Sequence, residues 1–420
     1  MLCVSSDNTN EHDIKIGLNC AKNEHSRYNM SRKINHLFES WFTFNCETTH
    51  IRWMIIPNSA TPLKSRHIEG SIASKKVILS EKVYLYSIDT IIKYKLKITP
   101  LYISGCCFHG RVDILEWWKN SGLKLEYDEQ ALYNASKMRR IDVLNWWLHS
   151  GLELKYDETI LEYASRESLI EILEWWKNSG LPLKYEHFAM NTCDIAVLNW
   201  WKNSGLELKY SNDSLDLATE TGNIEALNWW VNSGLPLEYY SSAPDLIRIE
   251  SNVCIKVLNW WVNSGLELKY YEEHLDSISG AGYIDVLNWW LESGLELKYS
   301  EDALNNASSM CNIDVLKWWK ASGLELKYTE HLIDVLSYKI SYKNDKDSSI
   351  LNVLEWWKNS GLPLKYSEKT LIYASRNGNI KVLNWWKDSG LPLKYSKSLI
   401  TLDDFKPDVA NWWKNSGLLD

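Results

Sequence analysis

The chain of 420 residues is 45% hydrophobic and 24% charged, values that are ordinary for a folded water-soluble protein. Its net charge of -8 argues against a nucleic-acid partner, because such a partner is bound through clustered Lys and Arg. No stretch reaches the roughly 18 apolar residues of a membrane helix, so we expect no membrane partner.

The start of the chain, MLCVSSDNTNEHDIKIG, lacks the basic end and the apolar core of a secretory signal. The eight cysteines are unevenly spaced and include no CxxC pair, so we expect neither a disulfide framework nor a zinc site. Reduced cysteines fit an intracellular protein, and we expect a cytoplasmic one.

Residues 1–86 carry no clear copy of the repeat that fills the rest of the chain, so we expect a separate non-repeat region there. Within it, INHLFESWF (34–42) has the pattern of an amphipathic helix. HIRWMII (50–56) suits either a strand or a helix, because short apolar runs do not distinguish the two.

A pair of adjacent tryptophans recurs eleven times between residues 87 and 420 and accounts for 22 of the 24 tryptophans. Six of the ten intervals between successive pairs are 29 residues long. A period of this size indicates a stack of small units, each too thin to bury its own apolar face. A degenerate unit precedes the first pair, with Lys93 and Tyr94 where the tryptophans would stand.

The first half of the repeat, S-E-x-A-L-x-x-A-S-x-x-G, predicts a short helix. Ser300 or Asp157 can cap its N-terminus. Leu304 and Ala307 lie three residues apart and therefore share one face of the helix. The unit before Trp200 has lost four residues around EHFAMNTCD, which predicts a shortened first helix there.

The second half, N-I-D-V-L-N-W-W-x-N-S-G-L-E-L-K-Y, predicts a second helix followed by an extended segment. Asn223, Asn312 and Asn379 are plausible N-caps. Val143, Trp146 and Trp147 recur at helical spacing and are expected to form the apolar side. The glycine of each copy suits a left-handed C-cap, and GLELKY then alternates apolar and polar side chains.

The tryptophan pairs are expected to fill the space between one unit and the next, since each indole carries roughly 150–250 Å² of buriable surface. The alternative is a row of exposed aromatic rings that binds carbohydrate or choline. Packing is favoured because Val-Leu precedes seven of the eleven pairs and Ser-Gly-Leu follows all of them.

The segments ALNNASSMCNIDVLKWWKASGLEL (303–326) and LIYASRNGNIKVLNWWKDSGLPL (371–393) resemble the ankyrin repeat, with the tryptophan pair in the two-leucine site. The resemblance implies an all-α, ankyrin-like helical-repeat solenoid of about eleven units over residues 87–420, the first of them degenerate. Two features depart from the family: the period is 29 instead of the usual 33, and the T-P-L-H opening is absent.

The sequence contains no GxxxxGK, HExxH or GxSxG motif, so we expect no catalytic, cofactor-binding or metal site and no cofactor. The ankyrin resemblance implies a non-catalytic scaffold that binds another protein. Two alternatives stay open: the carbohydrate- or choline-binding array, and an adaptor that recruits ubiquitin-ligase machinery through residues 1–86.

A partner is expected to bind at first-helix positions that packing leaves free to vary, which line the concave side in ankyrin-like stacks. These positions are Asn134, Lys137, Met138, Tyr163, Arg166, Glu167, Tyr373, Arg376 and Asn377. The last pair, Trp412 and Trp413, is followed by no further first helix. We therefore expect it to lack a neighbour and to permit weak self-association through the C-terminal end.

Overall fold

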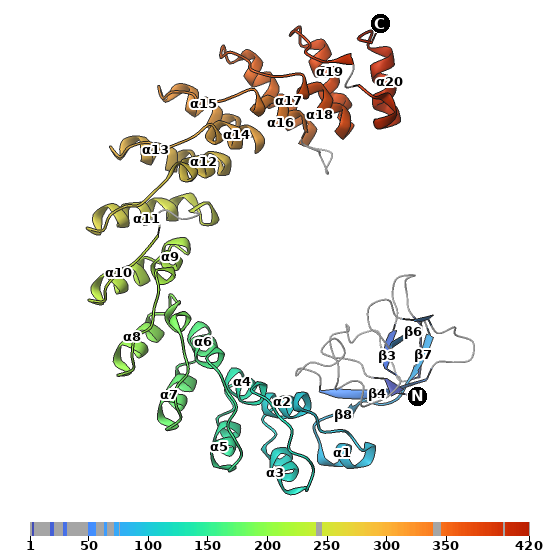
Figure 1. The fold of residues 1–420 in the computed structure, drawn as a ribbon, viewed down its shortest axis with the longest axis vertical. Helices are drawn as coiled ribbons and strands as arrows, with labels where there is room; N and C mark the ends of the chain where they lie inside the picture. Colours follow the sequence, from blue (N-terminus) through green and yellow to red (C-terminus); the bar gives the residue numbers. More distant parts are fainter. Residues whose placement is uncertain are drawn as a thin grey trace. The chain divides into compact units, whose positions relative to one another are not determined.

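The computed structural model describes residues 2–3, 17–20, 28–31, 49–55, 63–64, 71–74, 76–240, 246–338, 346–397 and 400–419. The chain divides into two compact units, Met1–Ser211 and Asn212–Asp420, which are described in turn (Figure 1). From Ile88 onward the described chain is helical apart from turns and short extended segments. None of the described helices is long and apolar enough to cross a membrane.

Short antiparallel strands precede the helices in the first unit. They are β1 (Leu2–Cys3), β2 (Gly17–Cys20), β3 (Tyr28–Ser31), β4 (His50–Ile55), β5 (Leu63–Lys64), β6 (Ser71–Ser74), β7 (Lys76–Leu79) and β8 (Val83–Tyr84). One sheet has the order β1-β4-β7-β2 with β8 beside β4, and the other has the order β3-β6-β5. The segment predicted as strand or helix at 50–56 is therefore a strand over its described part, His50–Ile55, while the helix predicted at 34–42 lies outside the described residues.

The rest of the first unit consists of α1 followed by pairs of helices or turns, and the second helix of each pair carries a tryptophan pair near its C-terminus. The helices are α1 (Ile88–Tyr94), α2 (Pro100–Phe108), α3 (Val112–Asn120), α4 (Gln130–Lys137), α5 (Ile141–His149), α6 (Thr159–Arg166), α7 (Ile170–Asn178) and α8 (Ile195–Asn203). First helices α2, α4 and α6 contact one another in sequence. The four missing residues before Trp200 reduce the next first helix to a 3-10 turn, His187–Met190, as predicted.

The second unit repeats the same pairing. Its first helices are α9 (Asp213–Glu220), η4 (Leu246–Arg248), α12 (Glu272–Ala281), α14 (Asp302–Ser309), α16 (His331–Tyr338), α18 (Lys369–Asn377) and η6 (Leu402–Asp404). Its second helices are α10 (Ile224–Asn232), α11 (Ser251–Asn263), α13 (Ile284–Glu292), α15 (Ile313–Ala321), α17 (Lys346–Asn359), α19 (Ile380–Asp388) and α20 (Pro407–Asn415). Figure 1 shows the successive second helices α10, α11, α13 and α15 following one another along one side of this unit.

Two of the three predicted asparagine caps are confirmed. The side chains of Asn223 and Asn379 each accept a hydrogen bond from the backbone N–H three residues on. The expectation for Asn312 is wrong, because its amide Nδ2 donates to the carbonyl of Gly280, 2.6 Å away, in the preceding first helix. Asn312 also lies against Gly282, so the small residues of that helix leave room for the amide.

The glycines that follow the tryptophan pairs end the second helices in the predicted left-handed conformation. All eleven have φ between +72° and +80°. A Cβ built on any of these eleven glycines would meet no atom within 4 Å. Glycine is therefore favoured here by the backbone conformation itself and not by lack of space.

Candidate binding surface

The two tryptophans of a pair have different environments, although the sequence predicted that they share one buried side. The second tryptophan of all eleven pairs, which lie wholly within the described residues, is less than 2% exposed. The first is only half-buried in every pair. The two rings meet edge to face, as in Trp175 and Trp176, whose centroids are 5.2 Å apart.

In seven of the described repeats the second tryptophan donates a hydrogen bond into the first helix of the preceding repeat. Trp176 Nε1 lies 3.0 Å from Ser136 Oγ, and Trp319 Nε1 lies 2.9 Å from Ser279 Oγ. The equivalent bonds join Trp201 to Ser165, Trp357 to Ser308, Trp413 to Ser375, Trp261 to Thr219 and Trp147 to Cys107. The serine of each Ala-Ser pair is thus the acceptor for a buried indole N–H.

The first tryptophan donates to the second helix of the preceding repeat. Trp175 Nε1 lies 2.8 Å from Asn145 Oδ1, and Trp200 Nε1 lies 2.8 Å from Glu174 Oε2. The same bond joins Trp146 to Glu116, Trp260 to Asn228, Trp289 to Asn259, Trp318 to Asn288, Trp385 to Glu355 and Trp412 to Asn384. In these eight cases the Asn or Glu that stands directly before one tryptophan pair is therefore the acceptor for the first tryptophan of the next pair.

The extended segment completes the contact between repeats. The ring of Tyr156 packs against Trp176 with centroids 4.9 Å apart, and its hydroxyl donates to the carbonyl of Pro182 at 2.8 Å. Lys184 Nζ returns a bond to the carbonyl of Tyr156 at 2.8 Å and lies 4.6 Å from the centre of its ring. Because only the backbone carbonyl of position 182 is used, either Pro or Glu can occupy the equivalent position in each copy.

The C-terminal pair has its packing partner, so the expectation that it lacks a neighbour is wrong. Trp413 is 0% exposed and donates to Ser375 Oγ at 2.8 Å. Trp412 donates to Asn384 Oδ1 at 2.7 Å. Both indoles contact the preceding repeat, because that is the direction in which every pair faces. The expected self-association therefore no longer rests on unpaired tryptophans.

Asn134, the first of the predicted partner-binding residues, belongs to the packing between repeats. It is 6% exposed, and its Nδ2 donates to Ser104 Oγ in the preceding first helix. Lys137 and Met138 are half-buried at the end of the same helix, α4. Spacing along α4 could not reveal the buried position of Asn134, because Ser104 comes from another repeat.

Four of the other predicted residues, at α4 and α6, form one cluster centred on the ring of Tyr163. They are Lys137, Tyr163, Arg166 and Glu167. The Arg166 guanidinium lies 5.2 Å and Lys137 Nζ 5.7 Å from the centre of that ring. Tyr133 meets it edge to face at 5.4 Å. Arg166 also pairs with Glu167, 3.2 Å away, and both are exposed. Tyr133 was missed because its place in the helix is not among the variable positions selected from the repeat.

In the second unit the predicted residues Tyr373, Arg376 and Asn377 all lie on α18. Arg376 is exposed, whereas Tyr373 and Asn377 are half-buried. Tyr373 and Arg376 have the same three-residue spacing in the sequence as Tyr163 and Arg166. These are residue types that often dominate the energy of protein interfaces.

No protein-family model matches the chain, and a comparison with curated proteins finds no significant match. Among the described residues no group of three or more His, Cys, Asp and Glu side chains is arranged to hold a metal ion. The vicinal Cys106 and Cys107 are fully buried, and Cys107 Sγ accepts the hydrogen bond from Trp147.

Removing a serine acceptor should destabilise the protein only where an indole depends on it. We expect Ser279→Ala to cost about 1–3 kcal/mol in urea unfolding, because Trp319 Nε1 is left buried without a partner. Ser337→Ala is the matched control, because Ser337 is equally buried and its hydroxyl donates to the carbonyl of Ile333 without accepting an indole N–H from any described tryptophan. Equal losses in the two variants would contradict the role assigned to the indole bond.

The stability that the hydrogen bond of the first tryptophan contributes should depend on pH where the acceptor is glutamate. It should not depend on pH where the acceptor is asparagine. The hydrogen bond from Trp200, followed by one from Asn178, lowers the pKa of the Glu174 carboxyl. A lowered folded-state pKa means that the contribution of this bond to stability is present above the unfolded pKa and is lost as pH falls through the folded pKa.

We therefore expect the cost of Trp200→Phe to shrink in acid and the pKa of Glu174 to rise in the variant. Trp175→Phe, whose acceptor is the non-titrating Asn145, is the control, and its cost should not shrink in the same way. Carboxyl NMR titration and unfolding at a series of pH values give both quantities. A pKa of Glu174 that is unchanged in Trp200→Phe would refute the assignment.

Proposed function

We propose that the chain is a non-catalytic protein-interaction scaffold whose residues 87–420 form an ankyrin-like helical-repeat solenoid of about eleven units. The regular contacts between each repeat and its predecessor support the stacked arrangement, since each unit completes the packing of the one before it. The order of helix, helix, left-handed glycine and extended segment supports the ankyrin resemblance. On this proposal the protein works inside the cell, in the cytoplasm, and binds another protein without a cofactor.

The observation that carries the proposal is the separation between side chains used for packing and side chains left exposed. The tryptophans, the Ala-Ser serine and the Lys-Tyr pair recur because they join repeats. Arg166, Glu167 and Arg376 vary between copies and reach solvent. Such a division is typical of repeat proteins, in which common residues hold the stack and variable residues recognise the partner.

Two other functions have less support. A carbohydrate- or choline-binding array requires open aromatic faces, whereas the second tryptophans are buried and many of the first ones have their N–H engaged. An adaptor for ubiquitin-ligase machinery would depend on residues 1–86, of which the structure describes short strands and a few residues beside them.

Charge reversal at the exposed arginines should weaken binding without unfolding the protein. With a partner captured by the full chain and then purified, we expect Arg166→Glu or Arg376→Glu to weaken binding about tenfold or more, since arginine is enriched at binding hot spots. The melting temperature should stay within about 1 °C, because exposed residues away from packing contribute little to stability.

Lys202→Glu is the control for charge alone, because Lys202 is exposed on a second helix of the same unit as Arg166. It should bind the purified partner as the wild type does. Unchanged affinity in both arginine variants would move the binding site to the loops or to residues 1–86.

A further inference from the structure

An apolar stripe crosses three consecutive second helices of the second unit. The residue after the tryptophan pair is lysine in seven of the eleven copies and Leu148 in an eighth. In the remaining three it is Val231, Val262 and Leu291, on α10, α11 and α13. These three side chains are 36%, 51% and 41% exposed. They form what we call the apolar stripe.

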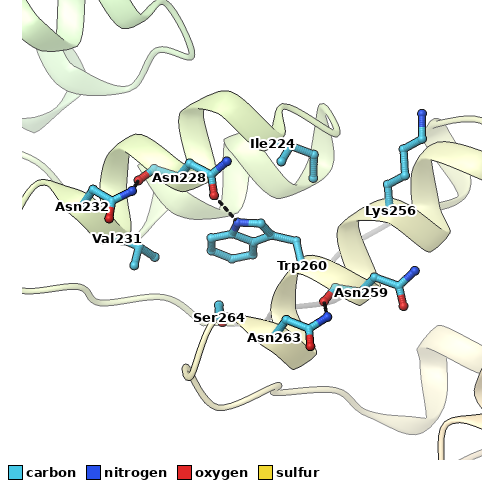
Figure 2. A pocket seen from close by; sticks show the side chains of 9 residues that line it. All are labelled: Ile224, Asn228, Val231, Asn232, Lys256, Asn259, Trp260, Asn263 and Ser264. Atoms are coloured by element: carbon cyan, nitrogen blue, oxygen red, sulfur yellow. Dashed lines mark hydrogen bonds between the residues drawn. The ribbon is translucent and has the colours of Figure 1, made fainter.

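A groove lies beside the first member of the apolar stripe, between α10 and α11 (Figure 2). Its volume is about 600 Å³. The half-buried indole of Trp260 lies in it, held by the 2.7 Å bond from Nε1 to Asn228 Oδ1. Ile224 and Val231 line the α10 side at a spacing of seven residues, which places them on one face of the helix. Lys256 lines the α11 side.

The repeat places the same elements between the next two pairs of helices. Trp289 is bonded to Asn259 at 2.9 Å, and Trp318 is bonded to Asn288 at 2.6 Å, as Trp260 is to Asn228. Val262 and Leu291 occupy the same repeat position as Val231. Helices α10, α11 and α13 contact one another in sequence, so the apolar stripe continues from one helix to the next.

The charges near the apolar stripe are mostly negative. Helix α10 carries the exposed carboxylate Glu225 and α13 carries the exposed carboxylates Asp285 and Glu292, whereas α11 carries none. The only basic side chain within these three helices is Lys256. A ligand with apolar residues and basic flanks therefore complements this face, whereas a second copy of the acidic chain would be repelled by it.

We propose that the apolar stripe binds an amphipathic α-helix of a partner protein, with apolar residues seven positions apart and Lys or Arg beside them. Packed helices lie about 8–10 Å apart, and an α-helix rises about 10.5 Å in seven residues. Apolar side chains at that spacing therefore meet Val231, Val262 and Leu291 in turn. An extended strand covers the same distance in about three residues, which places successive contacts on opposite faces of the strand.

This inference goes beyond the proposed function, because it concerns the second helices instead of the first and specifies the chemistry of the ligand. The probe is a synthetic amphipathic helix of 18 residues or so made of Leu and Lys, with Leu at seven-residue spacing. We expect it to bind the full chain in a fluorescence anisotropy titration at physiological salt. A peptide of the same composition in scrambled order should bind at least about tenfold more weakly.

Replacement of the apolar stripe by Gln should weaken peptide binding by about tenfold or more without a change in net charge. The variant is Val231→Gln/Val262→Gln/Leu291→Gln, and Val262→Gln alone, at the most exposed position, should show part of the loss. Folding is checked by circular dichroism and the melting temperature, since polar residues occupy this position in seven other repeats.

The matched control changes Lys358, Lys387 and Lys414, which stand at the same position in three other repeats of the unit, to Gln. This variant makes the chain more acidic and should bind the peptide at least as well as the wild type. Binding should also survive Arg166→Glu and Arg376→Glu, which test the proposed function separately.

Four results would overturn the proposal. They are unchanged affinity in the triple Gln variant, equal binding of the scrambled peptide, stronger binding of a proline-rich peptide of equal charge, and a dimer in sedimentation that the triple Gln variant abolishes. The last of these would assign the apolar stripe to a second copy of the chain.

Discussion

The buried indole N–H of the second tryptophan imposes the constraint on which the repeat packing depends. An indole contributes a large apolar surface, but its N–H loses water on burial and needs an acceptor. In seven of the described repeats that acceptor is a hydroxyl or thiol of the preceding first helix, as with Trp319 and Ser279. One contact therefore fixes the position of a second helix relative to the first helix of another repeat, which a short unit cannot achieve on its own.

The irregular repeats show what happens when this acceptor is missing. Trp290 follows the repeat whose first helix is only the turn η4, and its buried Nε1 has no hydrogen-bond partner in the described structure. The buried Nε1 atoms of Trp118 and Trp386 also have no partner in the described structure, although the first helix before the repeat of Trp386, α16, carries the buried Ser337 at the acceptor position. Their rings remain fully buried, so apolar packing holds these repeats without the bond. The hydrophobic surface thus already drives the packing of one repeat on the next. The hydrogen bond additionally fixes how the two repeats are aligned.

The sequence predicted features that depend on neighbours within one repeat. The two helices, the left-handed glycines, the caps at Asn223 and Asn379 and the shortened first helix before Trp200 all follow from local backbone chemistry and helical spacing. Spacing within a helix identifies the faces of that helix. It does not identify the atoms of another repeat that lie opposite.

The predictions that were wrong all concern contacts between one repeat and another. Asn312 and Asn134 both resemble residues with local or exposed roles, yet each donates its amide to the preceding repeat. The sequence predicted that Trp412 and Trp413 would have no following repeat to pack against. It could not show that these tryptophans pack against the preceding repeat instead. The different exposures of the two tryptophans, and the place of Tyr133 beside Tyr163, likewise depend on residues about one period away.

Hydrogen exchange of the indole N–H groups, followed by NMR on the full chain with labelled tryptophan, tests the central claim most directly. The second tryptophan of each pair is buried, so its N–H should exchange only when the repeat opens, whereas the N–H of the half-buried first tryptophan should exchange much faster. Two well-separated groups of signals, one from each position of the pair, are the predicted result. A single continuous range of rates, with first and second tryptophans intermixed, would contradict the account.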